Sequence, residues 1–190
     1  MRIISQNVTN YDIPVPDDYV FRINLAWCDS LSELESILQK HENHKIFLDL
    51  PIKRVKPPNN KYTLEELFPI IEKNTQIKYF AISNVESGKD LLEYIKKLPE
   101  NLVVVPKIES PNAVKNIEDI VLAMKNSEKV VMLDHDDLFS NLIKKQESPD
   151  NFKNYIKQLN EYCQKNNVLL LRTIGVIFSD EEKRTTQYLR

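Results

Sequence analysis

Glycine and cysteine are both scarce in this sequence. Its 190 residues include only two glycines, Gly88 and Gly175, so it lacks the glycine-rich loops of P-loop and dinucleotide-binding proteins. The two cysteines, Cys28 and Cys163, stand far apart, and the three histidines are scattered, so neither type shows the spacing of a structural zinc site. Without a disulfide framework, a reduced cytoplasmic protein is the expectation.

The sequence also lacks a large excess of charge and a long apolar run. A net charge of −2 gives no electrostatic reason to expect a nucleic acid or an anionic membrane as partner. No apolar stretch approaches the roughly 18 residues that a membrane span needs. The opening residues, M-R-I-I-S-Q-N, do not have the apolar core of a signal peptide. We therefore expect no nucleic-acid partner and no membrane segment.

Short β-prone runs alternate with segments of helical spacing along the whole chain. The runs rich in β-branched, aliphatic and aromatic residues lie at 1–5, 19–27, 45–50, 78–83, 102–105, 130–133 and 168–173. Apolar residues recur at helical intervals at 31–38, 64–71, 114–124 and 150–164. This alternation predicts an α/β fold with a parallel, TIM-barrel-like sheet. With about seven strands, and fewer than the roughly 250 residues of a typical barrel, residues 1–190 are predicted to form a single, incomplete barrel domain.

Charged side chains follow two neighbouring strands of the predicted sheet. Lys107 and Glu109 stand two residues apart at the end of one strand, so they face the same way. The next strand ends in L-D-H-D-D-L, residues 133–138, in which His135 is expected to be an exposed loop residue. Because the carboxyl ends of parallel strands form sites, this pattern predicts a divalent-metal site for an anionic substrate. The alternative is that these charges only mark where buried strands reach water.

Six segments share a common resemblance: V-F-R-I-N-L-A-W, I-F-L-D-L-P, Y-F-A-I-S-N-V-E-S-G-K-D-L, V-P-K-I-E-S-P-N-A-V-K-N-I-E-D-I, V-M-L-D-H-D-D-L-F and L-L-R-T-I. In the same order, they resemble parts of the catalytic domain of pyruvate kinase, a member of the phosphoenolpyruvate/pyruvate barrel superfamily. The similarity extends over about residues 20–180. It implies a pyruvate-kinase-like barrel that uses Mg²⁺ or Mn²⁺ and transfers a phosphoryl group by way of an enolpyruvate intermediate. The implied substrate is phosphoenolpyruvate, pyruvate or another small anionic 2-oxo acid.

The resemblance also implies roles for particular residues at the metal site. Glu109 and Asp137 would bind the divalent metal. Lys107 would stabilise the developing enolate or the transferring phosphoryl group, and Thr173 would act in the proton relay to the enolate carbon. A metal ion that bridges an enolate oxygen and a carboxylate would stabilise the negative charge that this chemistry develops.

Further implied residues belong to the substrate and to a second, monovalent cation. Arg22 would contact the phosphate, Asp136 and Asp137 would lie at the substrate, and Asn24 and Asp49 would help to hold K⁺. Ala26 and Leu50 stand where the family has oxygen ligands for that ion, so the K⁺ site is expected to be degraded. Asp136 replaces a glycine that approaches the substrate carboxylate in the family.

The chain departs from the pyruvate kinase pattern in ways that leave other functions open. A short loop around 57–60 is expected in place of the family's nucleotide-side lid domain, and no C-terminal regulatory domain is expected. One alternative is a Mg²⁺-dependent carbon–carbon lyase or aldolase of the citrate lyase β-subunit type, which needs no nucleotide domain. Another is a non-catalytic barrel remnant that acts as a binding module. A homo-oligomer or a partner chain would complete the barrel, because an open sheet edge is usually covered.

Overall fold

The computed structural model describes residues 1–5, 16–52 and 61–172. It contains a seven-stranded parallel sheet in which the strands follow one another in chain order, from β1 to β7. This is the strand order of a singly wound (β/α) barrel with fewer than eight strands, as the alternation of strands and helices predicts. The strands are β1 (Ile3–Ser5), β2 (Val20–Asn24), β3 (Lys45–Leu50), β4 (Ile77–Ile82), β5 (Val103–Ile108), β6 (Val130–Leu133) and β7 (Leu169–Arg172).

The described residues divide into two compact units. The first unit comprises Met1–Ser83 and Ile95–Val105, and the second comprises Asn84–Tyr94 and the described residues from Pro106 onward. Strand β5 contributes its first half to the first unit and its second half to the second unit.

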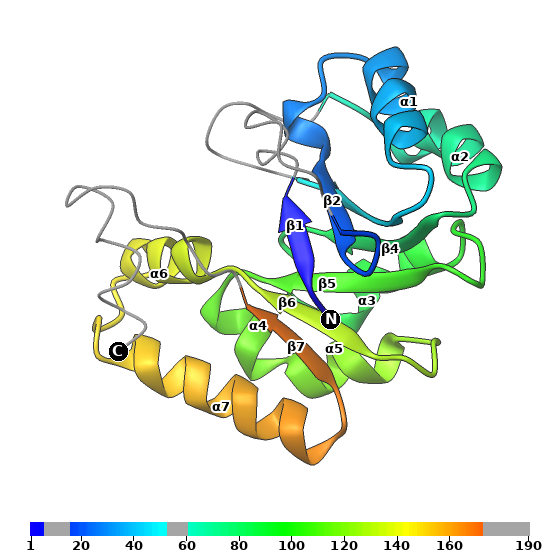
Figure 1. Ribbon diagram of the computed structural model, residues 1–190. Coiled ribbons are helices and arrows are strands. Elements are labelled where there is room, and N and C mark those ends of the chain that lie inside the picture. The colour runs from blue at the N-terminus through cyan, green and yellow to red at the C-terminus, as the bar shows by residue number, and fades with distance from the viewer. Residues whose placement is uncertain (6–15, 53–60, 173–190) are drawn as a thin grey trace. The chain divides into compact units, whose positions relative to one another are not determined.

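The first unit contains β1 to β4 with two helices, α1 (Leu31–Lys40) and α2 (Leu64–Lys73). The Ser30 side chain accepts a hydrogen bond from the Glu33 N–H, and Thr63 and Glu66 form the reciprocal capping box that their spacing predicts. The two helices lie side by side (Figure 1): Lys73 Nζ of α2 lies 3.7 Å from Glu35 Oε1 of α1, and Gln76 Nε2, in the segment after α2, donates to the Leu38 carbonyl.

Strand β2 is shorter than the run 19–27 predicts. The Asn24 side chain accepts a hydrogen bond from the Ala26 N–H at 3.0 Å, which turns the chain into a 3₁₀ turn at Leu25–Trp27. Strand β3 has the predicted bounds, and five of its six residues are buried. Burial on both faces is the expected state of a strand in a parallel sheet.

The second unit contains the end of β5, with β6 and β7, and most of its helices. These are α3 (Gly88–Ile95), which ends in the first unit, α4 (Pro111–Lys115), α5 (Ile117–Ala123), α6 (His135–Lys144) and α7 (Asn151–Lys165). One helix was predicted across 114–124, but the helix is interrupted at Asn116, which is both the C-cap of α4 and the N-cap of α5. Helix α7 lies against α4 and α5 and leads into β7 (Figure 1). Helix α6 begins directly at the carboxyl end of β6.

Gly88 lies at a close approach between α3 and α5. Its N–H donates to Asp119 Oδ2 at 2.7 Å, and a Cβ at this position would lie 2.7 Å from the Asp119 carbonyl oxygen and 3.0 Å from Ala123 Cβ. Both distances are shorter than ordinary van der Waals contacts, and the nearer atom belongs to the backbone, so one of the two helices would have to move.

We expect Gly88→Ala to lower the free energy of unfolding by about 1–3 kcal/mol, the usual range for overpacking. The cost of the clash should outweigh the roughly 1 kcal/mol by which alanine favours a helix over glycine. Urea denaturation measures the difference. Lys89→Ala, which changes the exposed next residue in the same turn, is the control and should stay within about 0.5 kcal/mol of wild type. Equal stability of Gly88→Ala and wild type would contradict the predicted clash.

Candidate metal centre

Glu109 follows β5 at its carboxyl end, and its side chain is held at both oxygens. Lys107 Nζ lies 2.8 Å from Oε1, and the Asn84 backbone N–H donates to Oε2 at 2.6 Å. The residue is only 2% exposed. As predicted from the two-residue spacing, Lys107 and Glu109 face the same side of the strand. The backbone of Glu109 is also fixed, because its carbonyl accepts a hydrogen bond from Asn141 Nδ2 of α6.

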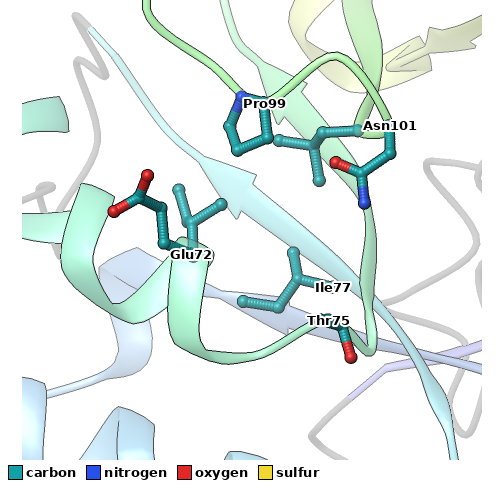
Figure 2. A pocket seen from close by; sticks show the side chains of 7 residues that line it. Glu72, Thr75, Ile77, Pro99 and Asn101 are labelled. Atoms are coloured by element: carbon teal, nitrogen blue, oxygen red, sulfur yellow. The ribbon is translucent and has the colours of Figure 1, made fainter.

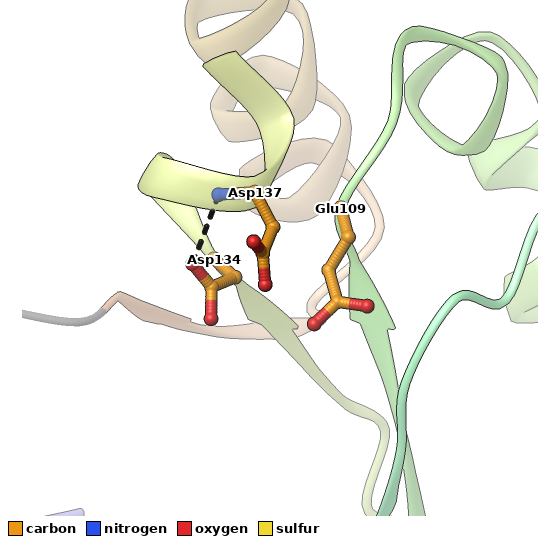
Figure 3. Close-up of side chains that lie close together, drawn as sticks. All are labelled: Glu109, Asp134 and Asp137. Carbon is orange, nitrogen blue, oxygen red and sulfur yellow. Dashed lines mark hydrogen bonds between the residues drawn. The ribbon is translucent and has the colours of Figure 1, made fainter. Parts of the chain in front are cut away.

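Two aspartates from the end of β6 lie close to Glu109. Asp134 is the N-cap of α6, and its Oδ1 accepts a hydrogen bond from the Asp137 N–H at 3.3 Å. Glu109, Asp134 and Asp137 each place one carboxylate oxygen within 4.8 Å of the others. Figure 3 shows the three side chains pointing toward one another from the end of β5, the end of β6 and the first turn of α6. We refer to these three residues as the acidic cluster.

Lys107 contacts two members of the acidic cluster. Its side chain is 6% exposed, and besides Glu109 its Nζ lies 3.8 Å from Asp134 Oδ2. Three carboxyl groups, one of them only 2% exposed, therefore lie close together beside this ammonium group. Neighbouring carboxylates repel one another unless a cation or a proton compensates their charge.

The surroundings of Glu109 raise its pKa. Burial of the carboxyl group raises its pKa to about 7, and the negative charge of Asp134 acts in the same direction. The ion pair with Lys107 and the Asn84 N–H lower the pKa but do not cancel the effect of burial. A divalent cation beside the carboxylate would favour its ionised form.

The donor set of the acidic cluster fits a hard divalent cation. Carboxylate oxygens are the ligands that Mg²⁺ and Mn²⁺ prefer, and Mg²⁺ usually keeps several water ligands beside one or two carboxylates. The cluster contains no sulfur or imidazole donor, which are the ligands typical of zinc. These residues therefore suit an oxygen-coordinated divalent ion.

His135 is buried rather than exposed in a loop, so that expectation was wrong. It is 2% exposed in the first turn of α6, and its ring packs edge-on against Phe152 of α7. Its Nε2 lies 3.3 Å from Nε and 3.1 Å from Nη2 of Arg172 at the end of β7. Burial, and then the charge of Arg172, lowers the pKa of His135 to about 4. The neutral ring thus accepts from the guanidinium and ties the start of α6 to β7.

The predicted residues Arg22, Asn24 and Asp49 lie in the first unit. Asp49 is fully buried and forms an ion pair with the Arg22 guanidinium, whose Nε lies 3.2 Å from Asp49 Oδ2. Asn24 is the register partner of Asp49 on the adjacent strand, and its side chain caps the 3₁₀ turn that follows β2. These contacts are structural, and the roles in binding phosphate and K⁺ stay predictions.

The remaining predicted residues have separate outcomes. Asp137 belongs to the acidic cluster, whereas Asp136 is exposed on the same turn of α6. Thr173 lies outside the described residues. Asp134 was not among the predicted ligands, although its spacing of three residues from Asp137 places both on one side of a helix start. That spacing was the signal that could have identified it.

A pocket of about 240 Å³ lies in the first unit, between the end of α2 and the segment before β5. Figure 2 shows side chains of both segments facing this pocket. Its lining residues are Ile71, Glu72, Thr75, Ile77, Pro99, Asn101 and Leu102. Glu72 is the one charged residue in this lining, and none of the predicted site residues takes part in it.

Comparisons with known proteins define the fold and leave the family open. No family model matches the chain, and no curated protein matches it. Among solved structures, RipC from Yersinia pestis is similar, with a TM-score of 0.61 and 15% sequence identity over 89% of this chain and 79% of that chain. At this identity the match supports the fold alone. None of the helices in the part of the chain that the structure describes is long and apolar enough to cross a membrane.

Proposed function

We propose that this protein is a divalent-metal-dependent enzyme that stabilises the enolate of a small 2-oxo acid. The acidic cluster of Glu109, Asp134 and Asp137 supports this proposal, because it brings three carboxylate groups together as oxygen ligands within 4.8 Å of one another. Its place at the carboxyl ends of β5 and β6 agrees with where sites form in parallel α/β proteins. Mg²⁺ or Mn²⁺ is the proposed cofactor.

In this mechanism the chain's own residues hold and orient the charges. Glu109, Asp134 and Asp137 would hold the ion, which would supply a positive charge at the oxygen where the enolate develops. Lys107 would hold the Glu109 and Asp134 carboxylates in place. The N–H of Asn84 would hold the second oxygen of Glu109. Preorganised charges of this kind need little rearrangement as the reaction proceeds.

The position of Lys107 favours carbon–carbon bond cleavage over phosphoryl transfer. Its ammonium group is almost fully buried and in contact with two carboxylates, which supports a role in balancing their charge. Direct contact with a transferring phosphoryl group would add a third anionic partner to an ammonium group whose side chain is only 6% exposed. We therefore place a lyase or aldolase acting on a 2-oxo acid first. Pyruvate-kinase-like phosphoryl transfer through enolpyruvate is the second candidate.

Exchange of the pyruvate methyl protons with deuterium tests this function. With Mg²⁺ in D₂O, the proposal predicts that the wild-type protein removes the methyl signal of pyruvate in NMR spectra, and that EDTA prevents the loss. Exchange without a nucleotide favours carbon–carbon cleavage, whereas exchange that requires ATP favours phosphoryl transfer. No exchange in the presence of Mg²⁺, whether or not ATP is added, would contradict enolate chemistry and favour a binding module.

A further inference from the structure

Asn84 has a backbone conformation that non-glycine residues seldom adopt. It follows β4 with φ of 55°, in the left-handed region that asparagine tolerates better than most side chains. In this conformation its N–H points at Glu109 and donates to Oε2 at 2.6 Å. Among the described residues, positive φ occurs at two other non-glycine positions, Gln146 and Asn167, and neither is part of the acidic cluster.

Glu86 fixes the turn that contains Asn84 to the segment that follows Glu109. Its Oε1 accepts a hydrogen bond from Ser110 Oγ at 2.8 Å, and its carbonyl accepts one from Asn116 Nδ2 at 2.9 Å. Ser110 is the residue directly after Glu109, so this clamp joins the two segments beside the carboxylate. These two hydrogen bonds of Glu86 therefore hold the turn at Asn84 next to the segment that carries Glu109.

A backbone donor and a lysine constrain a carboxylate in different ways. The Lys107 ammonium ends a flexible side chain and can follow Glu109 if the carboxylate rotates. The Asn84 N–H belongs to a clamped backbone, so it defines where Oε2 must lie. With Oε1 on Lys107 and Oε2 on Asn84, the plane of the carboxylate is set. Outer partners of this kind orient the ligands of a metal ion.

We propose that the left-handed turn at Asn84 is a positioning device for the metal centre: its N–H orients the Glu109 carboxylate toward Asp134 and Asp137. This inference rests on the proposed function, since it assigns Asn84 a role at the same site. Asn84 acts through Glu109 and is a positioning residue. What this position requires is the left-handed conformation of its backbone.

The test compares substitutions that keep or oppose that conformation. Asn84→Gly retains positive φ, whereas Asn84→Val disfavours it because its side chain is β-branched. We expect Asn84→Val to weaken Mn²⁺ binding at least about tenfold by calorimetry, within the 10–100-fold range for outer partners, and Asn84→Gly to stay within about threefold. Asn167→Val is the matched control, because φ there is 53° after α7, and it should bind Mn²⁺ as wild type does.

Melting temperatures in EDTA separate positioning from general strain. Asn84→Val and Asn167→Val should lose similar stability, and only the first should lose affinity. If Asn84→Val does not fold, Asn84→Ala replaces it, with the same expected tenfold loss. Unchanged Mn²⁺ affinity in folded Asn84→Val, or in Asn84→Ala where it replaces that variant, would overturn the positioning role and leave the proposed function intact. Absence of Mn²⁺ binding by wild type would instead overturn the proposed function, and the positioning role with it.

Discussion

Replacing Glu109 with glutamine is expected to weaken Mn²⁺ binding by roughly 100-fold or more, because both ligand charge and ligand geometry set divalent-ion affinity. Glutamine keeps the shape of the side chain and an oxygen that can accept from the Asn84 N–H. It removes one negative charge from the acidic cluster and replaces a carboxylate with a weaker ligand. Calorimetric titration of Mn²⁺ into both proteins measures the ratio of affinities.

Asp136→Asn is the matched control for this experiment. It removes the same charge from the first turn of α6, but Asp136 is exposed and does not belong to the acidic cluster. We expect its Mn²⁺ affinity to stay within about threefold of wild type, since an exposed charge is screened by solvent. If both variants lost affinity equally, the effect would be one of general electrostatic attraction, and Glu109 would not be a ligand.

Lys107→Met is expected to lower the free energy of unfolding by about 3–5 kcal/mol in EDTA, the range for breaking a buried ion pair from one side. Methionine has a similar length but carries no charge. Glu109 and Asp134 would then lose the ammonium group, which lies 2.8 Å from Glu109 Oε1 and 3.8 Å from Asp134 Oδ2. Mn²⁺ should recover part of the loss, about 2.7 kcal/mol at a concentration 100 times its Kd.

Urea denaturation with and without Mn²⁺ measures both effects. Lys157→Met is the control, because Lys157 forms an exposed ion pair with Glu161 on α7, and such pairs contribute at most about 1 kcal/mol. At one Mn²⁺ concentration used for both variants, recovery that is larger in Lys107→Met than in Lys157→Met would show that the ion and the lysine compensate the same charges. Equal recovery in the two variants would separate Lys107 from the metal centre.

Much of the fold could be predicted because its signals are local. The buried run at β3 and the capping box of Thr63 and Glu66 each depend on residues that are close in sequence. The start of α6 was missed because a charged segment after a strand resembles a loop. Asp134 is the N-cap of that helix, and the Asp-rich residues after it form the first turn, where acidic side chains are favourable.

The candidate site was only partly predictable for a similar reason. The alternation of a strand is enough to bring Lys107 and Glu109 to the same side, and the end of the next strand indicated Asp137. The contribution of Asn84 is a backbone N–H in an unusual conformation, so its residue type alone does not indicate it. The burial of His135 depends on its packing against Phe152, which is distant in sequence.

Titration of the wild-type protein with Mn²⁺ in the presence and absence of oxalate tests the central claim most directly. Oxalate mimics the enolate of pyruvate and offers two oxygens to a metal ion that keeps open positions. If the acidic cluster holds a divalent ion for enolate chemistry, Mn²⁺ will bind and oxalate will tighten its binding at least about tenfold, a coupling of roughly 1.4 kcal/mol. Absence of Mn²⁺ binding, or binding that oxalate does not change, would contradict the claim.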